Sequence, residues 1–339
     1  MSTLVIFCDV GPAYGVGHLM RCLALGEEFA DRGWSVVVAA DVASVPFAQA
    51  QVDARGFTHQ QAPAGVEEHV AVLAQHGADA AVIDSYHVPD EVYAATAALV
   101  PTLALVDGDP GPRTALMLLD QNIGAQGDDW PVGDGTVRLA GLDFALMRDE
   151  IRSQRPGSPV RADGVPPQVF AFFGGTDAFG AGPVLTEALI ATGRPFRLRV
   201  VAPVPWSEPP VPGPGQQIEL IGPTDRLAAE VLAADLVISA SGTSSWELLC
   251  LGAGCAFVCV AENQAEGYRR ILGEGLGLGL GSIGDLRHGT GAATTVLRTA
   301  LDDASLRSAL RDRAWSRVDG DGRVRAVDGF LRAASDRLG

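Results

Sequence analysis

The stretch LVIFCDVGPAYGVGHLMRCLAL, residues 4–25, decides the fold. It starts with a continuous apolar run at Leu4–Phe7, passes through glycine-rich residues and ends with apolar residues at helical spacing. A second apolar run, Val36–Ala40, follows after Gly33. Continuous apolar strands are typical of a parallel sheet buried on both faces, so the stretch predicts a strand, a helix and a parallel strand.

The same alternation recurs along the chain. The expected further strands are Ala80–Ile83, Thr102–Val106 and Leu116–Leu119 in the first half, and Val169–Phe173, Arg197–Ala202, Ile218–Ile221, Leu236–Ser239 and Ala256–Val260 in the second. Residues 155–168, between the halves, are rich in proline and glycine and have no hydrophobic period, which predicts a linker. We therefore expect α/β domains at 1–155 and 165–320, and a C-terminal helix at 321–339.

Composition narrows the classes of function. The net charge is −16, whereas a surface that binds duplex nucleic acid would show excess basic charge. All 25 basic residues are arginines, so no lysine can serve as a nucleophile, a Schiff base or a P-loop cation. The five cysteines have no metal-ligand spacing, and no leader or membrane span is apparent. These features predict a cytoplasmic protein with free thiols.

The turn between the first strand and its helix contains Gly15-Val16-Gly17-His18. Glycine lets a ligand approach the backbone closely, and the start of a helix attracts anions. His18 would lie at the carboxyl end of the sheet, where α/β folds place their sites, and imidazole suits general acid–base chemistry. The alternative is that His18 caps the helix or makes a structural hydrogen bond. The turn is neither a complete dinucleotide fingerprint, because position 20 is Met, nor a P-loop.

A similar loop, Ser241-Gly242-Thr243, follows the strand Leu236–Ser239 and opens a helix. Its small residues leave the first N–H groups of the helix accessible and its hydroxyls add donors, which suits a diphosphate. Glu247, one turn further, is placed to accept hydrogen bonds from a ribose. The alternative is that Ser241 or Thr243 caps the helix while Glu247 complements its dipole.

Two more polar segments follow strands of the second half. Gly174-Gly175-Thr176-Asp177 comes after its first strand, and Asn263-Gln264 comes after Ala256–Val260. Amide side chains donate and accept hydrogen bonds, which suits sugar hydroxyls, although Asn263 could simply cap the next helix. Because the carboxyl ends of parallel strands meet at one edge of a sheet, these segments favour a shared site.

The order of these motifs resembles a known family, the UDP-sugar hydrolases of the pseudaminic-acid pathway and their spore-coat polysaccharide relatives. The run Gly15–Leu25 is similar to the opening motif of that family, and the similarity extends from Leu4 to Ile271. The further similar segments are Asp84-Ser85-Tyr86, Leu119–Asn122, Phe173–Asp177, Ser241–Glu247 and Glu262–Gln264. The second-half motifs also resemble those of the lipid II-forming GlcNAc transferase, a metal-independent GT-B enzyme.

The resemblance implies a GT-B fold, in which two Rossmann-like doubly wound domains face a cleft. UDP would bind the second domain through Ser241, Gly242, Thr243, Glu247 and Ile221, which would contact diphosphate, ribose and base. His18 would be the general base. The residues implied to contact substrate are Gly15, Gly17, Arg21, Tyr86, Gly175, Thr176, Asn263 and Gln264. The partners would be a nucleotide sugar and a small acceptor, with no cofactor, metal or membrane span.

The acceptor is left open between a small molecule and water. The family's Arg-x-Asp pattern and longer loop are replaced here by Phe7-Cys8-Asp9, in a loop that shapes whatever accepts the sugar. We therefore favour transfer over hydrolysis. The chain also resembles enzymes that couple a UDP-uronate to cytosine, which makes Arg21 a candidate for binding a sugar carboxylate. Two further alternatives are a catalytically inactive protein that binds sugar nucleotides and an NAD-dependent redox enzyme, for which the dinucleotide fingerprint is incomplete.

Several polar residues are given other roles. Asp107-Gly108-Asp109 looks like the metal-binding DxD of other glycosyltransferases, but its glycine- and proline-rich surroundings predict a turn. His87, next to Tyr86, is a candidate for lining the cleft. For the histidines at 59, 69 and 76 we expect exposed or structural roles, and for Arg148 and Arg152 we expect surface or interdomain ion pairs.

Overall fold

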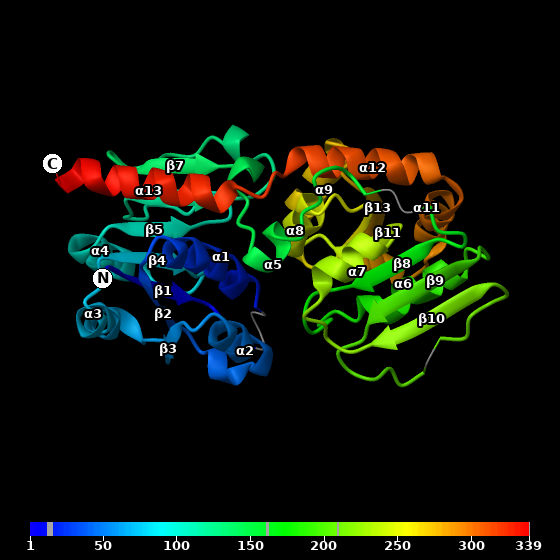
Figure 1. Cartoon of the computed structure of the whole chain (residues 1–339), viewed down its shortest axis with the longest axis horizontal. Coiled ribbons are helices and arrows are strands. Elements are labelled where there is room, and N and C mark those ends of the chain that lie inside the picture. Colours follow the sequence, from blue (N-terminus) through cyan, green and yellow to red (C-terminus); the bar gives the residue numbers. More distant parts are fainter. Residues whose placement is uncertain (12–15, 161–162, 209, 339) are drawn as a thin grey trace. The chain divides into compact units, whose positions relative to one another are not determined.

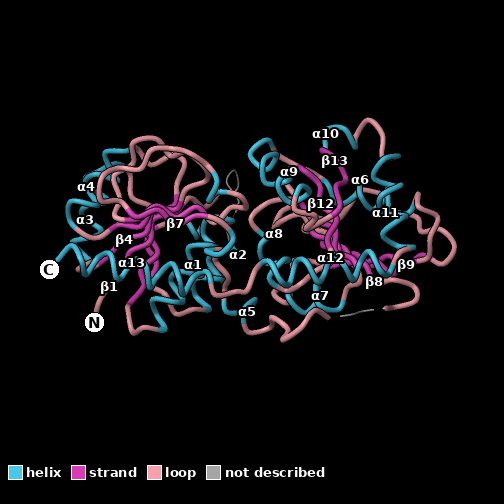
Figure 2. The backbone as a smooth tube through the Cα atoms, turned by 90° about the horizontal axis from the view of Figure 1, so that it is seen from above, coloured by secondary structure: helices cyan, strands magenta, loops and turns pink. Residues whose placement is uncertain are grey.

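The computed structural model describes residues 1–11, 16–160, 163–208 and 210–338. The chain divides into two compact units, of which unit 1 comprises Met1–Asp149 with Gly320–Gly339, and unit 2 comprises Glu150–Asp319. In each unit the strands form one parallel layer with helices on both sides of it (Figure 2). None of the described helices combines the length and apolarity that crossing a membrane requires.

The first strand of unit 1 lies inside its sheet, with other strands on both sides. Its order is β3-β2-β1-β4-β5-β6-β7, and every described pairing is parallel. Chain order therefore reverses at β1, which makes its carboxyl end the switch point where doubly wound folds bind ligands. The strands are β1 (Thr3–Cys8), β2 (Ser35–Ala39), β3 (Thr58–Gln60), β4 (Ala80–Asp84), β5 (Thr102–Leu105), β6 (Met117–Asp120) and β7 (Val137–Ala140).

The alternation of side chains along β1 divides the core of unit 1 into two layers. Leu4 and Ile6 pack in the cluster that contains residues of α1, α2 and α13, whereas Val5 and Phe7 pack in the cluster that contains residues of α3 and α4. All four are fully or almost fully buried, as expected for a strand covered on both faces. The helices are α1 (Gly17–Asp31), α2 (Pro46–Ala54), α3 (Gly65–His76), α4 (Asp90–Leu99) and α13 (Gly322–Leu338).

Unit 2 repeats this plan with the order β10-β9-β8-β11-β12-β13, again parallel throughout the described pairings. Its switch point is the carboxyl end of β8. The strands are β8 (Gln168–Phe172), β9 (Phe196–Val201), β10 (Gln216–Ile221), β11 (Leu236–Ala240), β12 (Cys255–Cys259) and β13 (Leu278–Ser282). The helices are α6 (Ala181–Ile190), α7 (Leu227–Ala233), α8 (Ser244–Cys250), α9 (Ala265–Gly273), α10 (Ile283–Leu286), α11 (Gly291–Asp302) and α12 (Ala304–Arg317).

The division between the units falls earlier than the linker expected at residues 155–168. The short helix α5 (Asp149–Arg152) spans the division. Residues after it belong to unit 2 because Arg155 donates to the carbonyl of Trp315 at 2.8 Å, while the Trp315 indole N–H donates to the carbonyl of Pro156 at 2.9 Å. These contacts hold the start of the expected linker against α12.

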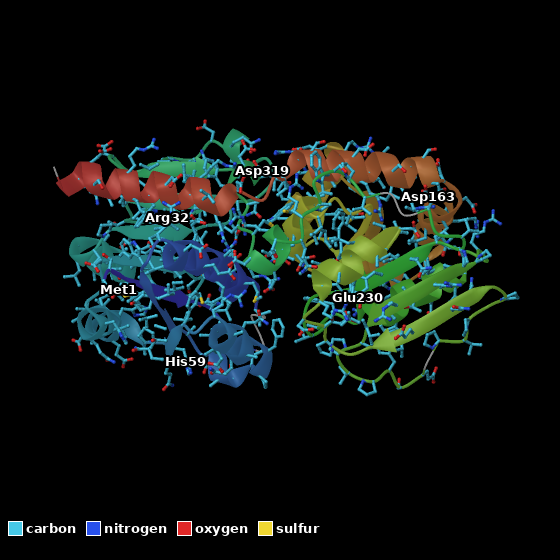
Figure 3. All side chains as sticks on the ribbon, in the orientation of Figure 1. Met1, Arg32, His59, Asp163, Glu230 and Asp319 are labelled. Carbon is cyan, nitrogen blue, oxygen red and sulfur yellow. The ribbon has the colours of Figure 1, made fainter. Side chains whose placement is uncertain are left out.

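The C-terminal helix α13, red in Figure 1, belongs to unit 1 rather than standing alone. Phe330 packs edge-on against Phe29 of α1, with ring centroids 6.0 Å apart. Arg323 is fully buried and forms ion pairs with Glu27, Glu28, Asp31 and Asp149. Arg32, labelled in Figure 3, pairs with Asp328 at 2.7 Å. The sequence did not predict this attachment, because its partners are separated by about three hundred residues.

Candidate active site

The first glycine-rich turn places His18 in the first turn of α1, which begins at Gly17. Gly15 lies outside the described residues. The His18 side chain keeps 15% of its exposure, and its Nδ1 lies 3.9 Å from Oδ2 of Asp9 and 3.7 Å from Oδ1 of Asp84. No side chain among the described residues caps α1, and none of them hydrogen-bonds this nitrogen. The capping alternative is therefore not what the described geometry shows, and Nδ1 faces two carboxylates.

Arg21 lies one turn further along α1 and is held between two carboxylates. Its Nε and Nη2 donate to Asp84, both at 2.6 Å, while Nη1 and Nη2 donate to Asp107 at 2.8 and 3.0 Å. Four of the five guanidinium N–H groups are thus used within the protein. Burial alone would lower the pKa of Arg21, but the charges of Asp84 and Asp107 outweigh it and raise the pKa. This pairing argues against Arg21 as the partner of a sugar carboxylate.

Asp107 belongs to this network rather than only to a turn. Besides Arg21, its carboxylate accepts hydrogen bonds from the Tyr86 hydroxyl and from Nδ2 of Asn122, the latter at 2.7 Å. Burial raises the pKa of Asp107, but the nearby Arg21 charge and the hydrogen bonds that the carboxylate accepts lower it well below its usual range. Asp107 is therefore ionised at any ordinary pH. Asp109 has the turn role expected for both residues, since it accepts from the N–H of Gly111.

Tyr86 is more than half exposed, yet both ends of the residue are attached. Its backbone N–H donates to Oδ2 of Asp9 at 3.0 Å, and its ring meets the His18 ring edge-on with centroids 4.7 Å apart. Partial burial and the negative charge of Asp107 both raise the pKa of the phenol. The hydroxyl therefore stays protonated and donates to Asp107.

These side chains converge because four neighbouring strands end at the same edge. Asp9 follows β1, Asp84 ends β4, Asp107 follows β5 and Asp120 ends β6. Asp120 is buried and accepts hydrogen bonds from the N–H groups of Gly108 and Asn122. Burial raises the pKa of its carboxyl group and outweighs these bonds, which lower the pKa. The site thus lies at the switch point of unit 1.

The sequence missed Asp9 and Asp107 as members of this site. The signal was present, because both follow buried apolar strands that the sequence predicts, and parallel strands end together. The Asp-Gly-Asp spacing instead resembles a metal motif, and its glycine- and proline-rich surroundings predict a turn. His87 is exposed in the loop that follows β4, next to Tyr86, and its backbone N–H donates to the Ser85 hydroxyl at 2.9 Å.

In unit 2 the loop after β11 and the segment after β12 touch one another. Ser241 is buried, and its hydroxyl donates to the carbonyl of Val258 at 3.3 Å and lies 3.5 Å from Oε1 of Gln264. A Cβ added to Gly242 would lie only 3.2 Å from Nε2 of Gln264. The Gln264 amide therefore packs against the small residues of the loop. Asn263 is exposed in the adjoining turn of helix, Glu262–Gln264.

The start of α8 supplies further polar groups at this edge. Thr243 is the N-cap residue and is exposed, but it makes no side-chain cap hydrogen bond, contrary to the capping alternative. The Ser245 hydroxyl and the Trp246 indole N–H are buried without a hydrogen-bond partner among the described residues. Glu247 is 9% exposed, one turn into the helix. Buried donors without partners are costly, so these two groups are an unusual feature of the start of α8.

The turn after β8 is divided between two roles. Asp177 has a positive φ of 45°, and its two carboxylate oxygens accept from the N–H groups of Ala181 and Gly182 at 2.8 and 2.9 Å. This carboxylate therefore holds the start of α6. Gly175 and Thr176 remain exposed beside it.

Ile221 lies further along the same edge of the sheet. It ends β10, which is separated from β11 by β9 and β8. At the usual strand spacing of about 4.8 Å, this places the ends of β10 and β11 roughly 14 Å apart. A ligand that contacts both Ile221 and Ser241 must therefore extend across two strands.

No protein-family model matches the chain, and no curated protein matches it. Solved structures do. MurG of Acinetobacter baumannii has 14% identity and a TM-score of 0.70, with 98% of this chain and 100% of that chain covered. The spinosyn rhamnosyltransferase SpnG has 16% identity and a TM-score of 0.64, with 97% and 100% covered.

The calicheamicin glycosyltransferase CalG4 has 15% identity and a TM-score of 0.58, with 98% of each chain covered. SpnG is also matched in complexes with thymidine diphosphate and with the spinosyn aglycone. The matches extend over both units and over almost the whole of each protein compared. The chain therefore has the GT-B fold, built from two doubly wound α/β units, as the sequence predicted.

Proposed function

We propose that this protein is a glycosyltransferase that cleaves a nucleotide sugar, with UDP-sugar as the expected donor, and transfers the glycosyl group to a small acceptor. The observation that carries the proposal is that one GT-B chain has two sheets whose carboxyl edges carry different groups. Unit 1 presents an imidazole facing two carboxylates, and unit 2 presents a neutral loop of small residues with accessible donors. A base and an anion site are the two parts that glycosyl transfer from a nucleotide sugar needs.

The diphosphate is assigned to Ser241, Gly242 and Thr243. The exposed Thr243 hydroxyl and the backbone N–H groups of residues 242–244 are the donors that we assign to a leaving diphosphate, because the N–H groups of Ser241, Ser245 and Trp246 already donate to backbone carbonyls. The ribose is assigned to Glu247 and the base to the region of Ile221. The sugar hydroxyls are assigned to Asn263, Gln264, Gly175 and Thr176, which lie on loops at the carboxyl edge of the same sheet.

His18 is assigned the role of general base. A neutral imidazole with its proton on Nδ1 directs that proton toward Asp9 and Asp84, and leaves the lone pair of Nε2 to accept a proton. The acceptor's O–H or N–H proton moves to Nε2 as the acceptor atom bonds to C1 of the sugar. The C1–O bond to the diphosphate breaks, and the nucleoside diphosphate leaves with the bonding electrons.

The closed pairing of Arg21 limits the choice of sugar. Arg21 is already paired with Asp84 and Asp107, both within the protein. It therefore has little left to offer a carboxylate on the donor sugar. We therefore do not assign Arg21 to the carboxylate of a uronate, and we propose that the transferred sugar is neutral.

The test is release of UDP from a panel of UDP-sugars, with dTDP-sugars alongside, with and without small acceptors that include cytosine. Mass spectrometry of the products identifies the transferred group. Transfer predicts that UDP release depends on the acceptor and that a glycosylated acceptor appears. Release at full rate without any acceptor would instead indicate hydrolysis, and binding of UDP without any release would indicate an inactive binding protein.

A further inference from the structure

His18 belongs to a closed cycle of contacts in unit 1. Nδ1 of His18 faces Asp84 at 3.7 Å, and Asp84 accepts two hydrogen bonds from Arg21. Arg21 donates two more to Asp107, which also accepts from the Tyr86 hydroxyl. The Tyr86 ring then returns to the edge of the His18 ring. This cycle of contacts joins the first two turns of α1 to the loops that follow β4 and β5.

We infer that Asp107 is a positioning residue, which fixes the His18 imidazole through Tyr86 and Arg21 without touching the reacting atoms. The inference rests on the role of His18 proposed above. Asp107 accepts four hydrogen bonds, two from Arg21 and one each from Tyr86 and Asn122. Because an ionised carboxylate has about four acceptor sites, no capacity is left for substrate.

Tyr86 needs such an attachment because its side chain is more exposed than buried. An exposed aromatic side chain exchanges among staggered rotamers unless something holds it. The bond from its hydroxyl to an ionised carboxylate is of the strong, charge-assisted kind. This bond keeps the Tyr86 ring against the edge of His18.

Without the ring of Tyr86, the imidazole can rotate about its Cβ–Cγ bond, a torsion with a broad two-fold preference. Rotation by half a turn exchanges Nδ1 with Cδ2 and moves Nε2 to the position of Cε1. The proton on Nδ1 would then no longer face Asp9 and Asp84, and the lone pair of Nε2 would point elsewhere. Loss of Asp107 would also leave the charge of Arg21 to Asp84 alone.

The kinetic test compares Asp107→Asn with Asp109→Asn, a control in the same turn whose carboxylate accepts from the N–H of Gly111. For Asp107→Asn we expect kcat to fall about 10- to 100-fold, the range for a misplaced catalytic group. We expect KM for the nucleotide sugar to change less than about twofold, because unit 2 is untouched. The Asp109→Asn variant should keep wild-type values. Equal kcat in wild type and a folded Asp107→Asn variant overturns the inference.

A spectroscopic test needs no turnover and so separates this inference from the proposed function. Nitrogen-15 NMR of histidine-labelled protein is recorded at about pH 9, above the usual imidazole range, and the His18 signal is identified by its loss in His18→Ala. The wild type should show His18 as the single Nδ1–H tautomer, and Asp107→Asn should show both tautomers. A single tautomer in both proteins overturns the inference, even if no sugar donor is ever turned over.

Tyr86→Phe keeps the test decisive if Asp107→Asn does not fold. This variant keeps the aromatic ring and the Arg21–Asp107 pair but removes the hydroxyl that attaches the ring. We expect a mixture of His18 tautomers and a fall in kcat smaller than that of Asp107→Asn. Wild-type tautomer and wild-type kcat in Tyr86→Phe would contradict the positioning role.

Discussion

The carboxyl edges of the two sheets have the same place in the fold but differ in how their polar groups are used. In unit 1 the edge is charged and internally paired, with Arg21 between Asp84 and Asp107. In unit 2 the loop after β11, Ser241-Gly242-Thr243, consists of small and neutral residues, and Ser245 and Trp246 of the following helix have buried donors without partners among the described residues. Most charged groups at the unit 1 edge are bonded to one another, whereas the unit 2 loop is the part that we propose binds the nucleotide.

This difference matches a division between chemistry and binding. Fixed charges that are already paired hold a reactive group in one orientation, which is what a general base needs. Accessible backbone N–H groups and hydroxyls bind an anion without introducing a countercharge. We expect substitutions in unit 1 to change turnover or stability, and substitutions in the unit 2 loop to change nucleotide affinity.

The largest expected effect comes from His18→Ala. Removal of a general base should lower kcat by about 10²–10⁴-fold. The Kd for UDP, measured by calorimetry, should remain at the wild-type value because the proposed nucleotide site lies in unit 2. Turnover close to that of the wild type would remove His18 from the mechanism, and a loss of UDP binding would contradict the division between the units.

Arg21→Leu should strongly destabilise unit 1. Breaking a buried ion pair leaves uncompensated carboxylates and costs about 3–5 kcal/mol. The ion pair of the exposed Arg199 with the half-buried Glu230, the latter labelled in Figure 3, offers a control in unit 2, where Arg199→Leu should cost no more than about 1 kcal/mol. Urea denaturation followed by hydrogen-exchange mass spectrometry reports each unit separately. Equal losses in the two variants would show that the Arg21 network does not stabilise unit 1.

Gly242→Val should weaken nucleotide binding without unfolding unit 2. The added side chain would crowd the Gln264 amide and cover the loop, since a Cβ alone comes within 3.2 Å of Nε2. Loss of one hydrogen bond to a charged diphosphate costs about 1.5–3 kcal/mol, or roughly 10- to 150-fold in Kd. Gly273→Val is a control, because a Cβ at Gly273 meets no described atom within 4 Å. Equal Kd values for UDP in both variants would place the diphosphate elsewhere.

The smallest effect is expected for Asp177→Ala. Removing the carboxylate that accepts from the N–H groups of Ala181 and Gly182 should cost about 1 kcal/mol, as for other helix caps. Asp177→Asn should keep most of this stability, because asparagine also caps helices and tolerates positive φ. Thermal denaturation compares the three proteins. A large loss of UDP affinity in Asp177→Asn would instead assign this side chain to the ligand.

The sequence predicts the buried strands well and the edges of the sheets poorly. Each strand expected from a continuous apolar run is present, with ends shifted by at most two residues. The strands β3, β7 and β13 were missed, and each lies at the edge of its sheet. Edge strands are covered less completely and need fewer apolar residues, as the exposed Thr58 and the glycines of Leu278–Ser282 show.

The sequence predicted where the candidate site residues lie along strands and helices, but not which contacts they make with one another. Local sequence placed His18 and Ser241 at the starts of helices, because strand, loop and helix follow one another within a few residues. The contacts of Arg21 with Asp84 and Asp107 join residues more than sixty positions apart, and no local pattern specifies them. Only the order of the strands in the sheet brings these carboxylates together.

Hydrogen-exchange mass spectrometry of the full chain with and without UDP tests the assignment of the two edges most directly. Binding of the diphosphate by the small residues after β11 predicts slower exchange in residues 240–247 and 260–265 and unchanged exchange in residues 16–31. Protection of residues 16–31 instead, or no protection anywhere at saturating UDP, would show that the loop at Ser241 is not a nucleotide site.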